Sequence, residues 1–185
     1  MDGKITYSRR KSLSLRIAPD GSLDIRAPLG MPRREIDRFL NEKAQWIAVH
    51  RAQVLRDRQQ GAQHPIDAEQ LETLKELAQG PIFESLRNYA PKMGVRYGRV
   101  TIRCQKSRWG SCSSAGNLNF NCLLALAPRE VLDYVVVHEL AHRLHMDHSA
   151  AFWQEVEKVL PDYRVRRDWL RQNGGALLAR IGENG

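Results

Sequence analysis

Two histidines and a glutamate stand at a spacing that is typical of metallohydrolases. His138, Glu139 and His142 form the pattern H-E-x-x-H. On a helix, residues four apart differ in direction by only about 40°, so both imidazoles can bind one ion. Glu139 directly follows the first ligand, which brings its carboxylate to a metal-activated water rather than to the metal. We therefore predict a zinc-dependent hydrolase in which Glu139 is the general base.

The residues around this motif are almost wholly apolar. Between Val131 and Ala141, only Asp133, Tyr134 and the motif itself carry polar groups. A buried helix that holds two imidazoles and a carboxylate is unfavourable unless something compensates for their desolvation. A bound dication would do so. The alternative is a pair of core histidines that are satisfied by ordinary hydrogen bonds.

A catalytic zinc site needs a third protein ligand and one open position. His148 follows His142 by six residues, which is the ligand spacing of metzincins. The metzincin glycine is absent, since His145 takes its place, and no Met-turn follows, so a true metzincin is not expected. We favour His148, because a ligand beyond the helix closes a tetrahedron more easily. His145 is the rival third ligand, and Glu155 and Glu157 are weaker ones. Ni²⁺ or another divalent transition metal also suits three imidazoles.

The elements before the motif are predicted from hydrophobic periodicity and turn residues. Residues 4–27 alternate weakly and predict a hairpin or small meander with a turn at Asp20-Gly21. Apolar positions at helical spacing predict a helix over about 32–58. The polar stretch 59–65 is the best candidate linker. A second helix is predicted over about 67–90, with a possible break at Gly80-Pro81.

The second half of the chain carries two strands and then three helices. Residues 95–104 and 118–122 alternate as strands, joined by a loop over 106–116. Pro128 precedes the motif helix, and Ser149 and Asp162 are N-cap candidates for two more helices, the last of which is predicted to end at Asn173-Gly174. Strands, helices, strands and helices in this order predict an α+β fold. We divide it into an N-terminal β-meander and helix lobe over 1–60 and a core over 61–185, or one continuous domain.

Charge and cysteine content restrict the cellular setting. The 185 residues carry 29 basic and 21 acidic side chains, a net charge of +8. Residues 1–60 hold 13 basic and 7 acidic groups, and residues 95–127 hold five basic groups and no acid. Such surfaces attract phosphates or acidic substrates, or simply keep the protein soluble. No run of about 18 apolar residues and no apolar leader is present, and Cys104, Cys112 and Cys122 fit neither a disulfide framework nor a C-x-x-C pair. We expect a cytoplasmic protein with reduced cysteines and no membrane partner.

Five motifs in order resemble the bacterial YgjP-like metallopeptidase family, which is related to the SprT-like zincins. They cover about residues 100–175: Arg108-Trp109-Gly110-Ser111-Cys112, Asn119-Phe120-Asn121, Asp133 to His142, His148-Ser149-x-x-Phe152-Trp153, and Pro161-Asp162-Tyr163-Arg164-x-Arg166-Arg167-x-Trp169-Leu170. The resemblance implies a compact zincin-type core with an active-site helix, a small antiparallel sheet, and a second helix that begins near His148. The strand near Trp109, Gly110 and Ser111 would then form the upper rim of the cleft, where zincins bind an extended peptide by main-chain pairing.

Further site residues are predicted on either side of the motif. Tyr163 and Arg166, in a run that also holds Arg164 and Arg167, could fold back over the metal and stabilise the developing oxyanion. The alternative is a solvated, basic helix start. Arg108 is the next candidate, and with Trp109, Gly110 and Ser111 it makes up the predicted substrate-binding segment.

Three functions fit these features. The first is a metallopeptidase-type hydrolase that acts on peptides or proteins. The second is a nucleoside triphosphate pyrophosphohydrolase acting on UTP-like nucleotides, because some members of the similar family are catalogued so and arginine can grip phosphate. The third is a DNA-associated protease, which the basic N-terminal lobe permits although no nucleic-acid-binding motif indicates it. We rank the three in this order.

Overall fold

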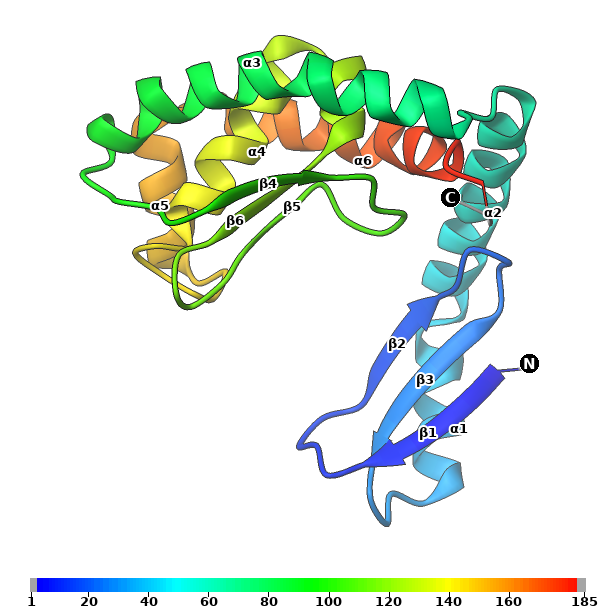
Figure 1. Ribbon diagram of the computed structural model, residues 1–185. Helices are drawn as coiled ribbons and strands as arrows, with labels where there is room; N and C mark the ends of the chain where they lie inside the picture. Colours follow the sequence, from blue (N-terminus) through cyan, green and yellow to red (C-terminus); the bar gives the residue numbers. More distant parts are fainter. Residues whose placement is uncertain (1–2, 183–185) are drawn as a thin grey trace. The chain divides into compact units, whose positions relative to one another are not determined.

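The computed structural model describes residues 3–182, and the chain divides into two compact units, Met1–Gln63 and His64–Gly185. Each unit has its own three-stranded sheet and its own helices, as the change of colour along the chain in Figure 1 shows. The fold class is α+β, as predicted. That residues 1–60 and 61–185 fold as separate domains stays a prediction.

The first unit is a three-stranded sheet followed by two helices. β3 (Leu23–Pro28) is central: it pairs in parallel with β1 (Gly3–Ser8) and antiparallel with β2 (Ser14–Ile17). The expected hairpin therefore forms between β2 and β3, but the three strands do not form the expected β-meander, because β1 pairs with β3 rather than with β2. Gly21, with φ of 81°, makes the β2–β3 turn at the predicted place, since glycine adopts this backbone conformation without strain. Alternate residues of β3 face the helices. The core of this unit consists of Leu23, Ile25, Ala27, Ile36, Leu40 and Ile47.

The helical part of this unit differs from the prediction. The expected single helix over 32–58 is interrupted at Lys43, whose φ of −97° and ψ of 6° lie outside the helical range. It therefore forms α1 (Arg33–Glu42) and α2 (Ala44–Gln63). α2 also continues through most of the stretch 59–65 that was expected to be a linker.

The second unit begins with α3 (Ala68–Lys92), the longest helix. A capping box at its start has Asp67 accepting from the backbone of Gln70, while the Gln70 side chain accepts from the backbone of Asp67. Gly80 and Pro81 do not interrupt α3. None of the helices formed by residues 3–182 combines the length and apolar character that a membrane crossing needs. The elements that follow are β4 (Val100–Arg103), β5 (Gly110–Cys112), β6 (Leu118–Asn121), the 3-10 helix η1 (Cys122–Leu126), α4 (Arg129–Ala141), α5 (Ala150–Val159) and α6 (Tyr163–Ala179).

The sheet of the second unit is mixed. β6 is central, parallel to β4 and antiparallel to β5, in the order β4-β6-β5. Only the β5–β6 pair therefore has the antiparallel pairing that was expected. Periodicity predicted a loop over 106–116 where β5 lies, because three residues are too few to show a period-2 pattern, whereas the family resemblance implied a strand near Trp109, Gly110 and Ser111.

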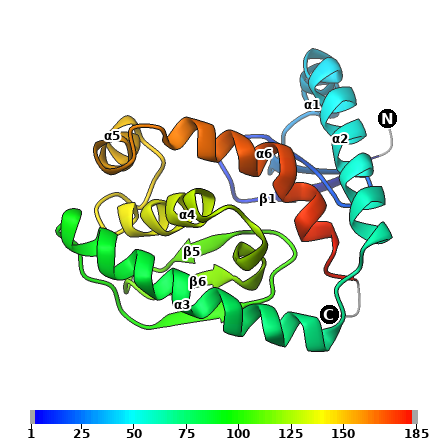
Figure 2. The ribbon, with the colours of Figure 1, turned by 90° about the horizontal axis from the view of Figure 1, so that it is seen from above.

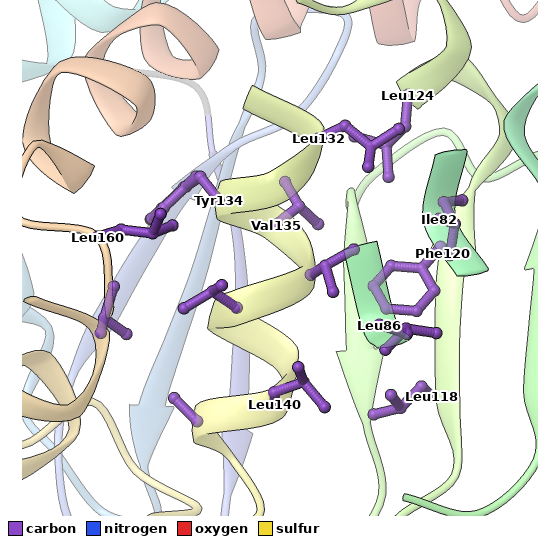
Figure 3. Packing of buried hydrophobic residues seen from close by; sticks show 14 of the residues in the cluster. Ile82, Leu86, Leu118, Phe120, Leu124, Leu132, Tyr134, Val135, Leu140 and Leu160 are labelled. Atoms are coloured by element: carbon purple, nitrogen blue, oxygen red, sulfur yellow. The ribbon is translucent and has the colours of Figure 1, made fainter. Parts of the chain in front are cut away.

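Helices cover one face of this sheet. α4 contacts α3, α5, α6 and β5, and Figure 2 shows it between α3 and α6. Leu118 and Phe120 of β6 point toward α3 and α4 (Figure 3), and both are buried. The run Val135–Val137 of α4 is also buried, so packing supports a helix through β-branched residues whose intrinsic helix propensity is modest. The labelled residues of this cluster in Figure 3 are Ile82, Leu86, Leu118, Phe120, Leu124, Leu132, Tyr134, Val135, Leu140 and Leu160.

The last helix continues past its predicted end. Asn173-Gly174 was expected to close it, but α6 extends to Ala179. A Cβ added at Gly174 would lie 3.0 Å from Nε1 of Trp109. Gly174 therefore allows the indole to pack closely against the helix, and its role is a close approach rather than a helix stop.

Candidate metal centre

α4 places the two motif histidines at its C-terminal end, next to each other on one face. The rings of His138 and His142 have centroids 5.0 Å apart. A hydrogen bond of 3.1 Å joins Nδ1 of His142 to the backbone oxygen of His145. This bond leaves Nε2 of His142 as the nitrogen that is available to a metal. A backbone oxygen is a common hydrogen-bond partner for the other ring nitrogen of a metal-binding histidine.

His148 reaches the same point from outside the helix. After α4 ends, a turn leads to Ser149, whose hydroxyl caps α5 by accepting from the backbone of Phe152 at 3.5 Å. The Nε2 atoms of His148 and His138 lie 3.0 Å apart. Tetrahedral Zn–N bonds of about 2.0–2.1 Å would set ligand nitrogens about 3.3 Å apart, so the two rings are already close to ligand separation.

The three imidazoles form a group that is suited to a metal ion. One potential ligand atom from each of His138, His142 and His148 lies within 4.8 Å of the others. Within residues 3–182, these three side chains form the group that could hold a metal ion. The side chain of His145 is not part of it. Glu155 forms an ion pair with Lys158, and Glu157 forms one with Arg164.

A buried phenylalanine supports all three rings. Phe152 is fully buried, and its ring centroid lies 4.9 Å from that of His138, 4.7 Å from that of His142 and 4.9 Å from that of His148. The contacts fix the orientation of the imidazoles from the α5 side. Phe152 was noted only as part of a family motif, although its place in the first turn of the helix that follows His148 was a usable signal.

Burial keeps two of the imidazoles in the state that can bind a metal. Burial, followed by the neighbouring His142 and His148, lowers the pKa of His138 to about 3. Burial also lowers the pKa of His142. Neutral imidazoles are the metal-binding form, so these two rings need not lose a proton near pH 7. Nδ1 of His138 and Oε2 of Glu139 are buried without a hydrogen-bond partner. The three imidazoles fit a divalent transition metal, and the charge of such an ion would offset the desolvation of the nearby Glu139 carboxylate.

Glu139 is held between α4 and β5. It is 5% exposed, and burial raises its pKa to about 8 while the charge of Arg108 acts to lower it. A Cβ at Gly110 would lie 2.6 Å from Oε1 of Glu139 and within 2.9 Å of its Cγ and Cδ. The absence of a side chain at Gly110 therefore makes room for the carboxylate. The sequence placed both residues in the site but did not reveal this contact.

A buried asparagine positions the predicted substrate-binding segment. The side-chain amide of Asn121 donates to the backbone oxygens of Gln105, at 2.6 Å, and Arg108, at 2.8 Å, and its backbone amide donates to that of Trp109, at 2.9 Å. These bonds fix the loop that leads into β5. Asn121 is fully buried, and it was recognised from the sequence only as part of a family motif.

The four residues of this segment face different surroundings. Arg108 is near enough to Glu139 to influence its pKa, and Gly110 contacts the Glu139 side chain. Ser111 lies on the opposite face, where its hydroxyl accepts a 3.3 Å hydrogen bond from Asn119. Trp109 packs against the main core and against Gly174, so its surroundings are those of a core residue.

Tyr163 lies near the three imidazoles, separated from His138 by the ring of Trp153. It is buried and stacks on Trp153 with centroids 5.3 Å apart, and Trp153 lies 5.8 Å from His138. The guanidinium of Arg167 lies 5.2 Å from the Trp153 ring and 5.7 Å from the Tyr163 ring, which is within the range of cation–π attraction. Arg167 was named in the basic run but not singled out, although its position four residues after Tyr163 places both on one face of α6.

Arg166 has structural partners. Its guanidinium forms an ion pair with Asp162 at 3.0 Å and donates to the backbone oxygen of Glu130 at 3.3 Å. These bonds link the start of α6 to the first turn of α4.

Tyr134 lies one turn before His138 on α4. The two ring centroids are 5.9 Å apart in an edge-on arrangement, and burial raises the pKa of Tyr134 to about 12.

Comparison with known proteins identifies a family for this chain. The family model described as YgjP-like, metallopeptidase domain, matches residues 11–75 and 63–173, which include the three imidazoles and Glu139. A search of curated proteins found no match. Among solved structures, the crystal structure of the metallopeptidase zymogen of Pyrococcus abyssi abylysin is similar at 28% identity and a TM-score of 0.45, over 48% of this chain and 90% of that chain. On the strength of the family match, this chain belongs to the YgjP-like metallopeptidase family.

Proposed function

We propose that this protein is a zinc-dependent hydrolase of the metallopeptidase type, in which His138, His142 and His148 hold the ion. The observation that supports this most is the convergence of three imidazoles beside a buried carboxylate, with their potential ligand atoms within 4.8 Å of one another. Three neutral nitrogen ligands are the set found in catalytic zinc sites, which keep a fourth position open. Ni²⁺ or another divalent ion would find the same ligands.

Glu139 is the proposed base. When bound, the ion supplies a Lewis acid that lowers the pKa of water and polarises the substrate carbonyl. The Glu139 carboxylate accepts a proton from the attacking water, and then delivers it to the leaving amine nitrogen. Burial against Gly110 excludes solvent from the carboxylate and holds it in one place. Burial alone raises the pKa of Glu139, and the charge of a bound ion would lower it again, so that the carboxylate is ionised when it accepts the proton of the water.

The substrate proposed is an extended peptide that lies along β5. β5 is an edge strand of its sheet, next to β6 on one side only, and Gly110 on this strand contacts Glu139. Edge strands bind peptides through main-chain hydrogen bonds, which tolerate many side chains. The family match is to a metallopeptidase domain, and it lends no support to nucleotide hydrolysis or DNA association.

Roles for the remaining predicted residues follow from their surroundings. We assign Arg108 to the stabilisation of developing negative charge, because its guanidinium already acts on the Glu139 carboxyl. Tyr163 is proposed for the same role, but through the Trp153 ring it is one layer away from the ligands. The ion pair of Arg166 with Asp162 favours a positioning role for that residue over direct catalysis.

The test is an activity screen with a matched blank. The metal-loaded protein and its Glu139→Gln variant are compared on unfolded proteins and on a panel of nucleoside triphosphates, with metal content measured by elemental analysis. We expect about one ion per chain in both proteins and proteolysis that falls about 10²–10⁴-fold in the variant. Nucleotide turnover above the blank without proteolysis would instead establish the phosphohydrolase. Equal activity of both proteins on every substrate would refute the assignment of Glu139.

A further inference from the structure

Two of the three cysteines lie side by side where the parallel strands β4 and β6 end. Arg103 pairs with Asn121, and the next residues along the two strands are Cys104 and Cys122. Paired strands are about 4.7–4.9 Å apart, which falls within the Cα separation of about 4.4–6.8 Å in disulfides. The two Sγ atoms are 2.8 Å apart, and both thiols are free. Backbone register and side-chain position therefore both suit a covalent bond between them.

The two thiols differ in their access to solvent. Cys122 is fully buried, while Cys104 is partly exposed. Burial, followed by the adjacent Cys104, raises the pKa of Cys122 to about 12, and the Lys75 ammonium acts in the opposite direction. A small oxidant therefore reaches Cys104 first, and Cys122 is placed to react with the product. Cys112 on β5 has no cysteine neighbour and is a natural control.

We propose that Cys104 and Cys122 are a modification site, which hydrogen peroxide or a related peroxide converts to an intramolecular disulfide. The Cys104 thiolate attacks one peroxide oxygen, the O–O bond breaks, and a sulfenic acid and hydroxide form. The Cys122 sulfur then attacks the Cys104 sulfur, the S–O bond breaks, and the leaving hydroxide takes the Cys122 proton as water. In sum, two thiols lose two electrons and two protons, and one peroxide becomes two waters. A dithiol reductant reverses the reaction.

The disulfide would close a covalent ring that contains the segment from Cys104 to Cys122, which forms one wall of the proposed metal centre. Cys104 directly precedes Gln105, and Cys122 directly follows Asn121, whose amide holds the backbone oxygens of Gln105 and Arg108. The ring from Cys104 to Cys122 therefore contains β5 with Gly110. The sulfurs need to approach only from 2.8 Å to about 2.05 Å, so the loop keeps its native hydrogen bonds. Oxidation should strengthen this wall without displacing it, and it should protect both sulfurs from irreversible oxidation.

The experiment treats the full-length, metal-loaded protein with hydrogen peroxide, blocks remaining thiols, and maps the products by peptide mass spectrometry. In the wild type we expect a linked peptide pair that contains Cys104 and Cys122, loss of two hydrogens, one blocked thiol at Cys112, and full reversal by dithiothreitol. The Tm should rise by about 5–10 °C on oxidation and return on reduction, because the ring constrains the unfolded chain. These readouts do not depend on catalytic activity, and so they stand or fall separately from the proposed function.

Three variants make the result decisive. Cys122→Ala removes the partner, so Cys104 should progress to sulfinic acid, a gain of two oxygens that dithiothreitol does not reverse. Cys104→Ala should leave the buried Cys122 unmodified under the same treatment, and it serves if the Cys122 variant folds poorly. Cys112→Ala should form the linked pair as the wild type does. Persistence of both thiols, linkage through Cys112, or linkage only between chains would each overturn the proposal.

Discussion

Replacing Gly110 by alanine should separate the fold of this protein from its catalysis. The added Cβ would lie 2.6 Å from Oε1, 2.8 Å from Cγ and 2.9 Å from Cδ of Glu139. Contacts this short do not persist, and one partner must move. Gly110 has no positive φ, so its backbone accepts alanine, and the opposing atoms belong to a side chain rather than to backbone. We therefore expect the Glu139 carboxylate to move.

The expected effect on the rate is large and the effect on stability is small. A shift of about 1 Å in a catalytic group reduces the rate about 10²-fold, and complete loss of a general base costs about 10²–10⁴-fold. The Gly110→Ala variant should thus lose at least about 10²-fold in kcat. Its free energy of unfolding should fall by about 1–3 kcal/mol, the usual effect of overpacking. Metal content should not change, because the three atoms nearest to the new methyl group all belong to Glu139, which is not a proposed metal ligand.

The assay compares Gly110→Ala with two other variants. Gly80→Ala makes the same chemical change on α3, where the new Cβ meets nothing within 4 Å, and it should retain full activity and gain up to about 1 kcal/mol of helix stability. The double variant with Glu139→Gln should be no slower than Glu139→Gln alone, because both changes disable one group. A Gly110→Ala enzyme within a few-fold of wild type, or a further loss in the double variant, would refute the proposed contact.

Three further outcomes follow from the same geometry. His148→Ala should lower metal occupancy sharply while His145→Ala lowers it little, by elemental analysis after dialysis, and equal losses would contradict the ligand assignment. Asn121→Ala should lower the free energy of unfolding by about 2–4 kcal/mol in urea titrations, since two loop carbonyls lose their donor, whereas Asn119→Ala, with one 3.3 Å bond, should change it by less than about 1 kcal/mol. In metal-free protein, the pKa of Glu139 is raised from 4.5 to about 8, so its contribution to stability is complete below pH 4.5 and is lost as pH rises to about 8. The stability of Glu139→Gln relative to wild type should therefore increase over this range, and a constant difference would show that the carboxyl is not buried in solution.

Short-range patterns in the sequence were sufficient for most of the elements. Ser149 caps α5 as predicted, because an N-cap depends on a hydroxyl and the next three residues alone. The glycine turn at Gly21 is equally local. The errors fall where distant residues decide the outcome. The Asn173-Gly174 pair is typical of a helix end, but α6 continues through it. Packing of Gly174 against Trp109 outweighs the low intrinsic helix propensity of one glycine.

The sequence by itself determined the chemistry of the candidate site. The spacing of His138 and His142 is a property of one helix, and a glutamate after the first histidine follows the same helical geometry. The position of His148, six residues after His142, predicted the third ligand with His145 as its rival, and the family motifs added the segment around Gly110. Each of these inferences needed only a helix period or a fixed order along the chain.

Only the tertiary structure decided how the separate segments meet. His148 and His145 were both available to the metal from the sequence, and it is the turn after α4 that brings Nε2 of His148 within 3.0 Å of that of His138. The contact of Gly110 with Glu139 and the pairing of Cys104 with Cys122 join residues that are 29 and 18 positions apart. Such contacts depend on strand register and on the packing of α4 against β5. No local periodicity encodes them, because this packing arises only when the apolar faces of several elements are buried together.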